Sequence, residues 1–335
     1  MAEIDRHGSL NISRFFLGRV LRITPAIWVL LSVYALLNPL DSSRIFQAVS
    51  LAVLNFTDYD VALGWNNSIE SGLGFCWSLA VEEKFYLLFP LLMIFYKRFR
   101  SPLCLLVLVV LAEAWKFSQI APTTDALRLM GAFDIRFDEI LIGCLAASLL
   151  DRKERYSNLF NTLARPIVPP LLFLCVIYFL RHFVYPPTLL TLAQKQLCWV
   201  VSIPIFALLV GLLLLSLAAV QEQGRRCLLS KALSCPPMIG LGRLSYSLYL
   251  WHGLAFLLAA NLVLQECWLL DAAKVAAAIF MAFVSYSLVE KPFLTIKKHL
   301  CSATASSLPQ VEPEERNSQG NSLNNAKELE LSGVR

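Results

Sequence analysis

Residues 75–90 read FCWSLAVEEKFYLLFP, and they place two adjacent carboxylates and a lysine inside an otherwise apolar segment. Ionisable groups at membrane depth are costly, so they usually face a bundle interior or a wet cavity and mark a functional pathway. The alternative is a helix that begins near the interface, where Glu82, Glu83 and Lys84 snorkel to the lipid headgroups. The cost of burial favours the functional interpretation, and the segment predicts a helix bundle with a polar interior.

The composition of the chain is that of an integral membrane protein. Of its 335 residues, 57% are hydrophobic and 16% are charged, and the mean hydropathy is +0.61. Soluble domains carry about 25% charged residues. The net charge of +5 does not indicate a nucleic-acid partner, because the basic residues are distributed between apolar segments. The nine cysteines show neither a CxxC pair nor a cysteine–histidine spacing, so no metal site is expected.

Apolar segments long enough to span a bilayer recur along the chain. A spanning helix needs about 20 mostly apolar residues. Residues 44–56 are shorter, and we interpret them as an interfacial or re-entrant helix. The last span is expected to stop at Pro292. We therefore expect an all-α polytopic bundle of about eight spans, at 23–40, 77–96, 102–117, 135–150, 167–183, 198–220, 240–260 and 272–290.

The distribution of lysine and arginine predicts the orientation of the bundle. Most of them fall in loops of one side, which the positive-inside rule assigns to the cytoplasm. Both termini are therefore expected inside, and residues 41–76 outside. Residues 1–22 would be a cytoplasmic segment and residues 23–298 the transmembrane domain. Residues 299–335 are rich in Ser, Asn and Glu and predict a disordered cytoplasmic tail.

Two arginines open the first predicted span. Arg19 and Arg22 are three residues apart, so they share one helix face at the cytoplasmic membrane surface. Guanidinium groups fixed there could clamp phosphates, because arginine presents a planar fork of donors. They could instead be topology anchors that bind lipid headgroups, which residue chemistry alone favours.

A second charged entry into a span is the block RFDEILIG at 136–143. Arg136 with Asp138 or Glu139 could supply counter-ions for the two glutamates of the first segment, because both segments begin on the predicted outer side at similar depth. The alternative is interfacial charge at a helix start, where acidic residues are favourable. The residues alone do not separate these interpretations.

Residues 242–252, GRLSYSLYLWH, carry polar side chains on one helix face. Ser245, Tyr249 and His252 fall at i, i+4 and i+7. Polar side chains in a bundle often only hydrogen-bond between helices, and this is favoured for Ser245. His252 lies well inside a predicted span, so it is the stronger functional candidate.

Taken together and in order, these segments resemble acyltransferase family 3 of integral membrane O-acyltransferases, which acetylate bacterial surface polysaccharides, nodulation factors and macrolides. No single block is decisive, but their order along the chain is specific, and only the tail lies outside the match. The matching blocks are FFLGRVLRITP at 15–25, WSLAVEEKFYLLFP at 77–90, RFDEILIG at 136–143, RLSYSLYLWH at 243–252 and SYSLVEKPF at 285–293.

The resemblance implies a bundle of about ten helices in the inner membrane of a bacterium. It implies a donor, usually acetyl-CoA, that enters from the cytoplasm, and an acceptor hydroxyl on a cell-surface glycan or lipid-linked sugar. Arg19 and Arg22 would contact the CoA phosphates. No permanently bound cofactor is expected. We expect catalytic roles for Glu82, Arg136, Asp138 and His252, and substrate contacts from Tyr86, Tyr246 and Tyr249.

The chain departs from the family pattern in three places. Lys84 stands where the family usually has glutamine, and Gly18 where it has a second arginine. The family's first two helices, which carry an arginine–histidine signature, are absent because the resemblance begins near Glu3. The chain is therefore expected to be a family member that starts about two helices late, through a misplaced start codon or a truncated gene. Without that histidine it is expected to be inactive.

Two other functions compete with a membrane O-acyltransferase. A proton-coupled transporter would use Glu82 and Glu83 as its relay, and substrate flux without acyl transfer would identify it. A truncated, non-catalytic membrane protein is the other alternative, which the missing helices favour.

Overall fold

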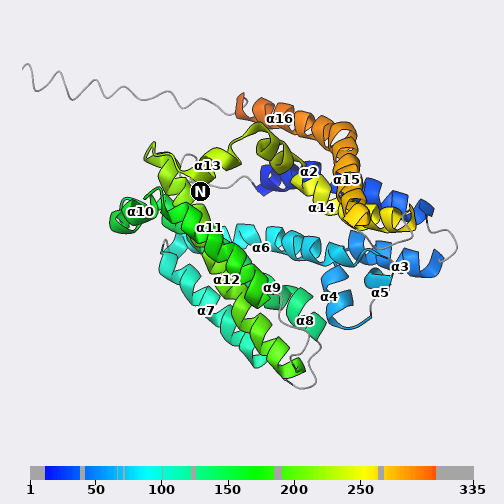
Figure 1. Cartoon of the computed structure of the whole chain (residues 1–335), viewed down its shortest axis with the longest axis horizontal. Helices are drawn as coiled ribbons and strands as arrows, with labels where there is room; N and C mark the ends of the chain where they lie inside the picture. The colour runs from blue at the N-terminus through cyan, green and yellow to red at the C-terminus, as the bar shows by residue number, and fades with distance from the viewer. Residues whose placement is uncertain are drawn as a thin grey trace, which may run out of the picture. The chain divides into compact units, whose positions relative to one another are not determined.

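The computed structural model describes residues 12–37, 42–65, 67–70, 72–99, 101–121, 126–184, 191–262 and 268–306. Every element in these ranges is a helix and none is a strand, which confirms the predicted all-α class (Figure 1). The chain divides into two compact units, Met1–Phe293 and Leu294–Arg335. The first unit contains the bundle and the candidate site.

Each of the predicted spans is occupied by a helix. Among the described residues, three helices could cross a membrane by length and apolar composition, or up to four if a bent pair of helices counts as one span. The remaining helices are shorter or less apolar, so the number of spans stays a prediction. The helices in question are α2 (Ile12–Leu37), α6 (Trp77–Phe99), α7 (Pro102–Ser118), α9 (Phe133–Asp151), α11 (Val168–Phe179) with the π-turn η3 (Leu180–Val184), α12 (Leu192–Glu222), α14 (Pro236–Leu262) and α15 (Trp268–Ser285) with the π-turn η4 (Tyr286–Glu290).

Short helices connect these long ones. The predicted short helix at 44–56 is confirmed as α3 (Ser42–Val53). The others are α4 (Thr57–Ala62), α5 (Asn67–Glu70), η2 (Gly74–Cys76), α8 (Ala126–Gly131), α10 (Ser157–Leu163), α13 (Leu228–Leu233) and α16 (Lys291–Ser306).

Local sequence signals explain where several helices begin. The Ser101 hydroxyl caps α7 by accepting a hydrogen bond from the Leu103 amide at 3.2 Å, and Pro102 occupies the first turn. Thr191 and Gln194 form a reciprocal capping box at the start of α12. Pro25 lies inside α2, where a membrane bundle tolerates proline because neighbouring groups satisfy the freed carbonyl.

The main core lies where α2, α6 and α14 meet. Leu30, Leu250 and Leu254 are fully buried there, and Tyr34 is 2% exposed. A second group of helices packs in the order α7, α9, α12 and α11, and α6 contacts α9. Large apolar side chains such as Leu111 face outward, as expected of a surface that meets lipid.

Two expectations at the C-terminal end are wrong. Pro292 does not stop the helical run, because it occupies the first turn of α16, where no intrahelical acceptor is needed for its missing N–H. Residues 299–306 belong to α16 and are therefore helical rather than disordered. The rest of the predicted tail lies outside the described residues.

Candidate active site

Helices α2, α6 and α14 enclose a cavity of about 280 Å³, which we call the inner cavity. Two apolar residues, Ile23 and Leu79, form part of its wall, and the remaining lining side chains are charged or carry a hydroxyl. They are Arg19 and Arg22 from α2, Ser78, Glu82 and Tyr86 from α6, and Ser245, Tyr246 and Tyr249 from α14. The structure thus brings together most of the predicted site residues, from three segments far apart in the chain.

A chain of contacts links Arg19 to Glu82 through Tyr86. Arg19 Nη1 donates to the Tyr86 hydroxyl at 2.9 Å, and its guanidinium carbon lies 4.1 Å from the centroid of that ring. The Tyr86 hydroxyl in turn donates to the Glu82 carboxylate. Tyr86 and Glu82 are four residues apart, so they share one face of α6. The carboxylate therefore keeps further acceptor capacity toward the cavity.

Arg22 differs from Arg19 in having no such partner. Within the described part of the chain it forms no hydrogen bond and no ion pair, and its side chain is exposed at the cavity. Its nearest electrostatic neighbour is the buried carboxylate of Glu290, which accepts a hydrogen bond from Ser247. All the guanidinium donors of Arg22 thus remain available to a ligand.

Ser78 and Tyr249 form the wall of the inner cavity that lies farthest along α6 from Tyr86. Their hydroxyl oxygens are 2.6 Å apart, and the Tyr249 hydroxyl donates to the backbone carbonyl of Phe75. His252 lies behind this wall rather than in the cavity. Its Nδ1 is 2.5 Å from the Tyr249 carbonyl oxygen, and its ring packs on Phe75 with centroids 5.1 Å apart.

The structure does not bring Arg136 and Asp138 to the inner cavity. Asp138 is fully buried and pairs with Lys116 at 2.5 Å. Arg136 pairs with Glu139 on its own helix at 2.9 Å. The interpretation of these residues as counter-ions for Glu82 and Glu83 is therefore wrong, because each already has a closer partner. Their catalytic role stays a prediction.

Lys116 is a buried charge of α7 that the sequence analysis does not single out. It is 2% exposed and lies 3.7 Å from Glu113 as well as beside Asp138. The signal that could have found it is the pair of opposite charges three residues apart near the end of an apolar helix.

Lys84, where the chain departs from the family pattern, points away from the inner cavity. It forms an ion pair with Asp58 of α4, which is fully buried. Its Nζ also lies 4.5 Å from the centroid of the Tyr59 ring. Burial raises the pKa of the Asp58 carboxyl, and Lys84 opposes that rise. Lys84 is thus the counter-charge of a buried carboxylate.

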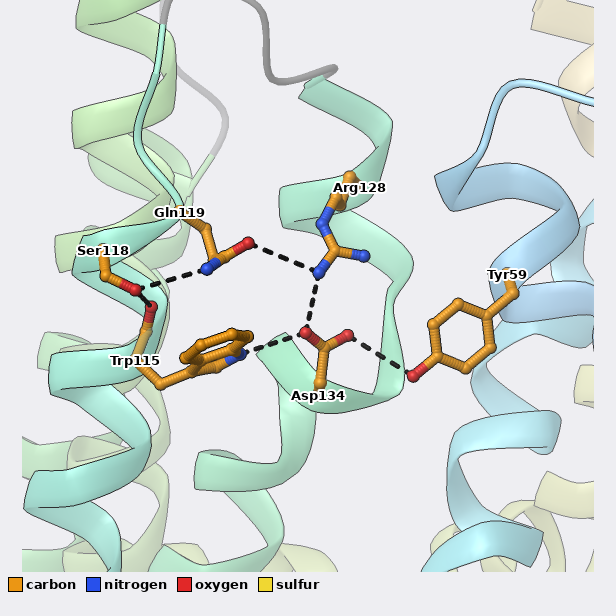
Figure 2. A network of polar contacts seen from close by, with 6 residues as sticks. All are labelled: Tyr59, Trp115, Ser118, Gln119, Arg128 and Asp134. Atoms are coloured by element: carbon orange, nitrogen blue, oxygen red, sulfur yellow. Dashed lines mark hydrogen bonds and ion pairs between the residues drawn. The ribbon is translucent and has the colours of Figure 1, made fainter.

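A further polar network joins α4, α7, α8 and α9, and Figure 2 shows it around Asp134. One oxygen of Asp134 accepts from Arg128 at 2.8 Å and from Trp115 Nε1 at 3.0 Å, and the other accepts from the Tyr59 hydroxyl at 3.5 Å. Gln119 accepts from Arg128 at 3.4 Å. These contacts satisfy the carboxylate completely and hold four helix ends together.

Comparison with known proteins places the chain in a family. The model of the acyltransferase domain family matches residues 7–289, and the chain belongs to that family.

Among its relatives are the peptidoglycan O-acetyltransferase OatA of Listeria monocytogenes and the O-acetyltransferase OatA of Staphylococcus aureus. The first is 25% identical over 319 residues, covering 87% of this chain and 48% of the relative. The second is 27% identical over 306 residues, covering 87% of this chain and 49% of the relative. The chain spans about half the length of these relatives. No solved structure matches it.

Proposed function

We propose that the chain is a membrane O-acyltransferase domain that moves an acyl group, acetyl in the first instance, from cytoplasmic acyl-CoA to a hydroxyl of a cell-surface glycan or lipid-linked sugar. The observation that carries the proposal is the inner cavity, where Arg22 and Glu82 face the same space without an ion pair. The names of the relatives, which include a peptidoglycan O-acetyltransferase, support a glycan acceptor.

The donor would bind through the arginines. Phosphate groups are bound well by guanidinium forks, and Arg22 has its donors free. Arg19, held by Tyr86, would supply a second positive charge at a fixed position. The pantetheine arm would then lead the thioester into the cavity toward Glu82.

The reaction requires a proton acceptor for the attacking hydroxyl. Its oxygen would form a bond to the thioester carbonyl carbon as the carbon–sulfur bond breaks, and the coenzyme A thiolate would take the proton back from the acceptor and leave as a thiol. In this proposal Glu82 accepts the hydroxyl proton, because it is the carboxylate that lines the cavity. The Tyr86 hydroxyl orients it by hydrogen bonding. General base action of this kind contributes roughly 10²- to 10⁴-fold. Arg136 and Asp138 would act by holding α9 in place.

The transporter alternative is less well supported. A relay through Glu82 and Glu83 requires both carboxylates to face one path, but Glu83 is not among the residues that line the inner cavity. The substrate flux that this alternative needs can be measured in the same vesicles as acyl transfer.

The proposal is tested with the full chain in lipid nanodiscs, labelled acetyl-CoA and a soluble peptidoglycan oligosaccharide as acceptor. The proposed reaction predicts a labelled ester, in contrast to the inactivity expected from the absent histidine, with a loss of about 100-fold or more in Glu82→Gln. Glu83→Gln is the matched control, since it removes the neighbouring charge without touching the cavity. Equal loss in both variants, or no ester with the unmodified chain, would contradict the proposed reaction.

A further inference from the structure

The wall of the inner cavity formed by Ser78 and Tyr249 is backed by one aromatic ring. Phe75 lies edge-on against Tyr249, with ring centroids 5.9 Å apart, and its backbone carbonyl accepts the Tyr249 hydroxyl. The other side of the ring faces Gly253, where an added Cβ would lie 2.9 Å from Phe75 Cε1. Phe75 thus contacts both Tyr249 and Gly253, and its removal would open space beside Tyr249.

The order of groups along α6 gives the cavity a direction. Tyr86 contacts Arg19 at one end. Glu82 lies one turn closer to the N-terminus of α6, and Ser78, one further turn along, meets Tyr249 at the other end. Successive members of this series are four residues apart, or about 6 Å along the helix. A donor whose phosphates are bound by the arginines and whose thioester lies at Glu82 would direct its acyl chain toward Ser78 and Tyr249.

We propose that the wall formed by Ser78 and Tyr249, with Phe75 behind it, sets the length of the acyl group and restricts the donor to short chains such as acetyl. This inference rests on the proposed acyl-CoA donor. Glu82 and Ser78 are about 6 Å apart along the helix axis, so a short acyl group held at Glu82 ends near the wall and a longer one requires Tyr249 to move. Phe75 is thus a positioning residue that acts through Tyr249, and it determines specificity rather than rate.

The wall is also polar at its surface, which strengthens the restriction. The two hydroxyls of Ser78 and Tyr249 are bonded to each other and to the Phe75 carbonyl. An alkyl chain that displaced them would leave buried polar groups without partners, which costs more than the burial of a methylene returns.

The test measures binding, so that it does not depend on turnover. S-ethyl- and S-butyl-coenzyme A are thioethers that cannot transfer a chain, and their dissociation constants are compared on the full chain in nanodiscs. Pockets discriminate one methylene by about 10- to 200-fold, so the unmodified chain should prefer the ethyl compound at least tenfold. Phe75→Ala should bring the two constants to within about threefold of each other, mainly by tighter binding of the butyl compound.

The matched control is Phe137→Ala, which removes a ring from the same core without contact to Tyr249. It should leave the preference for the ethyl compound unchanged. Phe75→Leu, which keeps most of the core volume, should give an intermediate preference and covers the case in which the alanine variant does not fold.

The outcomes separate this inference from the proposed function. Equal binding of both thioethers by the unmodified chain, or an unchanged preference in both Phe75 variants, overturns the role of the wall while the donor site stands. If coenzyme A itself fails to bind the unmodified chain, the donor site and this inference both fall.

Discussion

The inner cavity and the polar layer that includes Asp58, Asp134 and Asp138 both contain charged side chains, but they differ in whether those charges form ion pairs. In the polar layer each of these carboxylates has a cation beside it, from Lys84, Arg128 and Lys116 respectively. In the inner cavity neither Arg22 nor Glu82 forms an ion pair with a described residue. Removing a charge from the layer should therefore cost stability, and removing one from the cavity should cost ligand binding.

The largest stability effect is expected at Lys116. Lys116→Met leaves Asp138 buried without its counter-ion, and breaking such a pair costs about 3–5 kcal/mol. Thermal unfolding in detergent measures the loss, and Lys116→Met combined with Asp138→Asn should recover part of it. The matched control is Lys153→Met, which breaks an exposed pair with Glu222 and should cost less than about 1 kcal/mol. Equal losses at both lysines would contradict the assignment of a buried structural pair.

Arg22→Ala should show the reverse pattern. Each charge-assisted hydrogen bond contributes about 1.5–3 kcal/mol, so coenzyme A affinity should fall about 10- to 100-fold. The unfolding temperature should change little, because Arg22 forms no hydrogen bond or ion pair with a described residue and only its electrostatic interaction with Glu290 is lost. Arg243→Ala, at an exposed arginine of α14 outside the cavity, is the control. If both variants bind coenzyme A normally, Arg22 is only a topology anchor.

Lys84→Gln should produce a smaller loss that depends on pH. Burial already raises the pKa of the Asp58 carboxyl, and without Lys84 that pKa rises further above its unfolded value. The variant is therefore destabilised where unfolded Asp58 is ionised, at neutral pH, by about 1–3 kcal/mol. The loss should disappear on acidification, as Asp58 takes up a proton in the folded state. A loss of equal size at both pH values would rule out the Asp58 pair as its cause.

The smallest effect is expected for Trp115→Phe in the network of Figure 2. This change removes one hydrogen bond to Asp134, which keeps Arg128 as a partner, so about 0.5–1.5 kcal/mol should be lost. Coenzyme A affinity should not change, and a titration calorimeter can measure it on the same sample used for unfolding. Altered affinity would mean that the polar layer and the cavity are not independent.

The sequence predicted the helices better than it predicted their contacts. Hydropathy located the long helices because lipid imposes a strong apolar signal on each one. The resemblance to a family implied the roles of Arg19, Arg22 and Glu82, but that all three line one cavity was not predicted.

Which cation reaches which carboxylate could not be predicted, because helix rotation and packing decide it. Lys116 of α7 reaches Asp138 of α9, whereas Arg136 pairs with Glu139 on its own helix. No pattern in the sequence indicated a role for Phe75, because its proposed role depends on its contact with a glycine of α14.

The hydrogen bond from the Tyr246 hydroxyl to the Ile23 carbonyl, 2.8 Å long, joins positions 223 residues apart. During synthesis, α2 and α6 are made long before α14, so the inner cavity has only two of its three walls for most of translation. Closing so distant a contact carries the entropy of a long loop. Completion of the site is therefore a late event in biogenesis, and a ribosome that stalls before α14 leaves a product whose charged groups have never been enclosed.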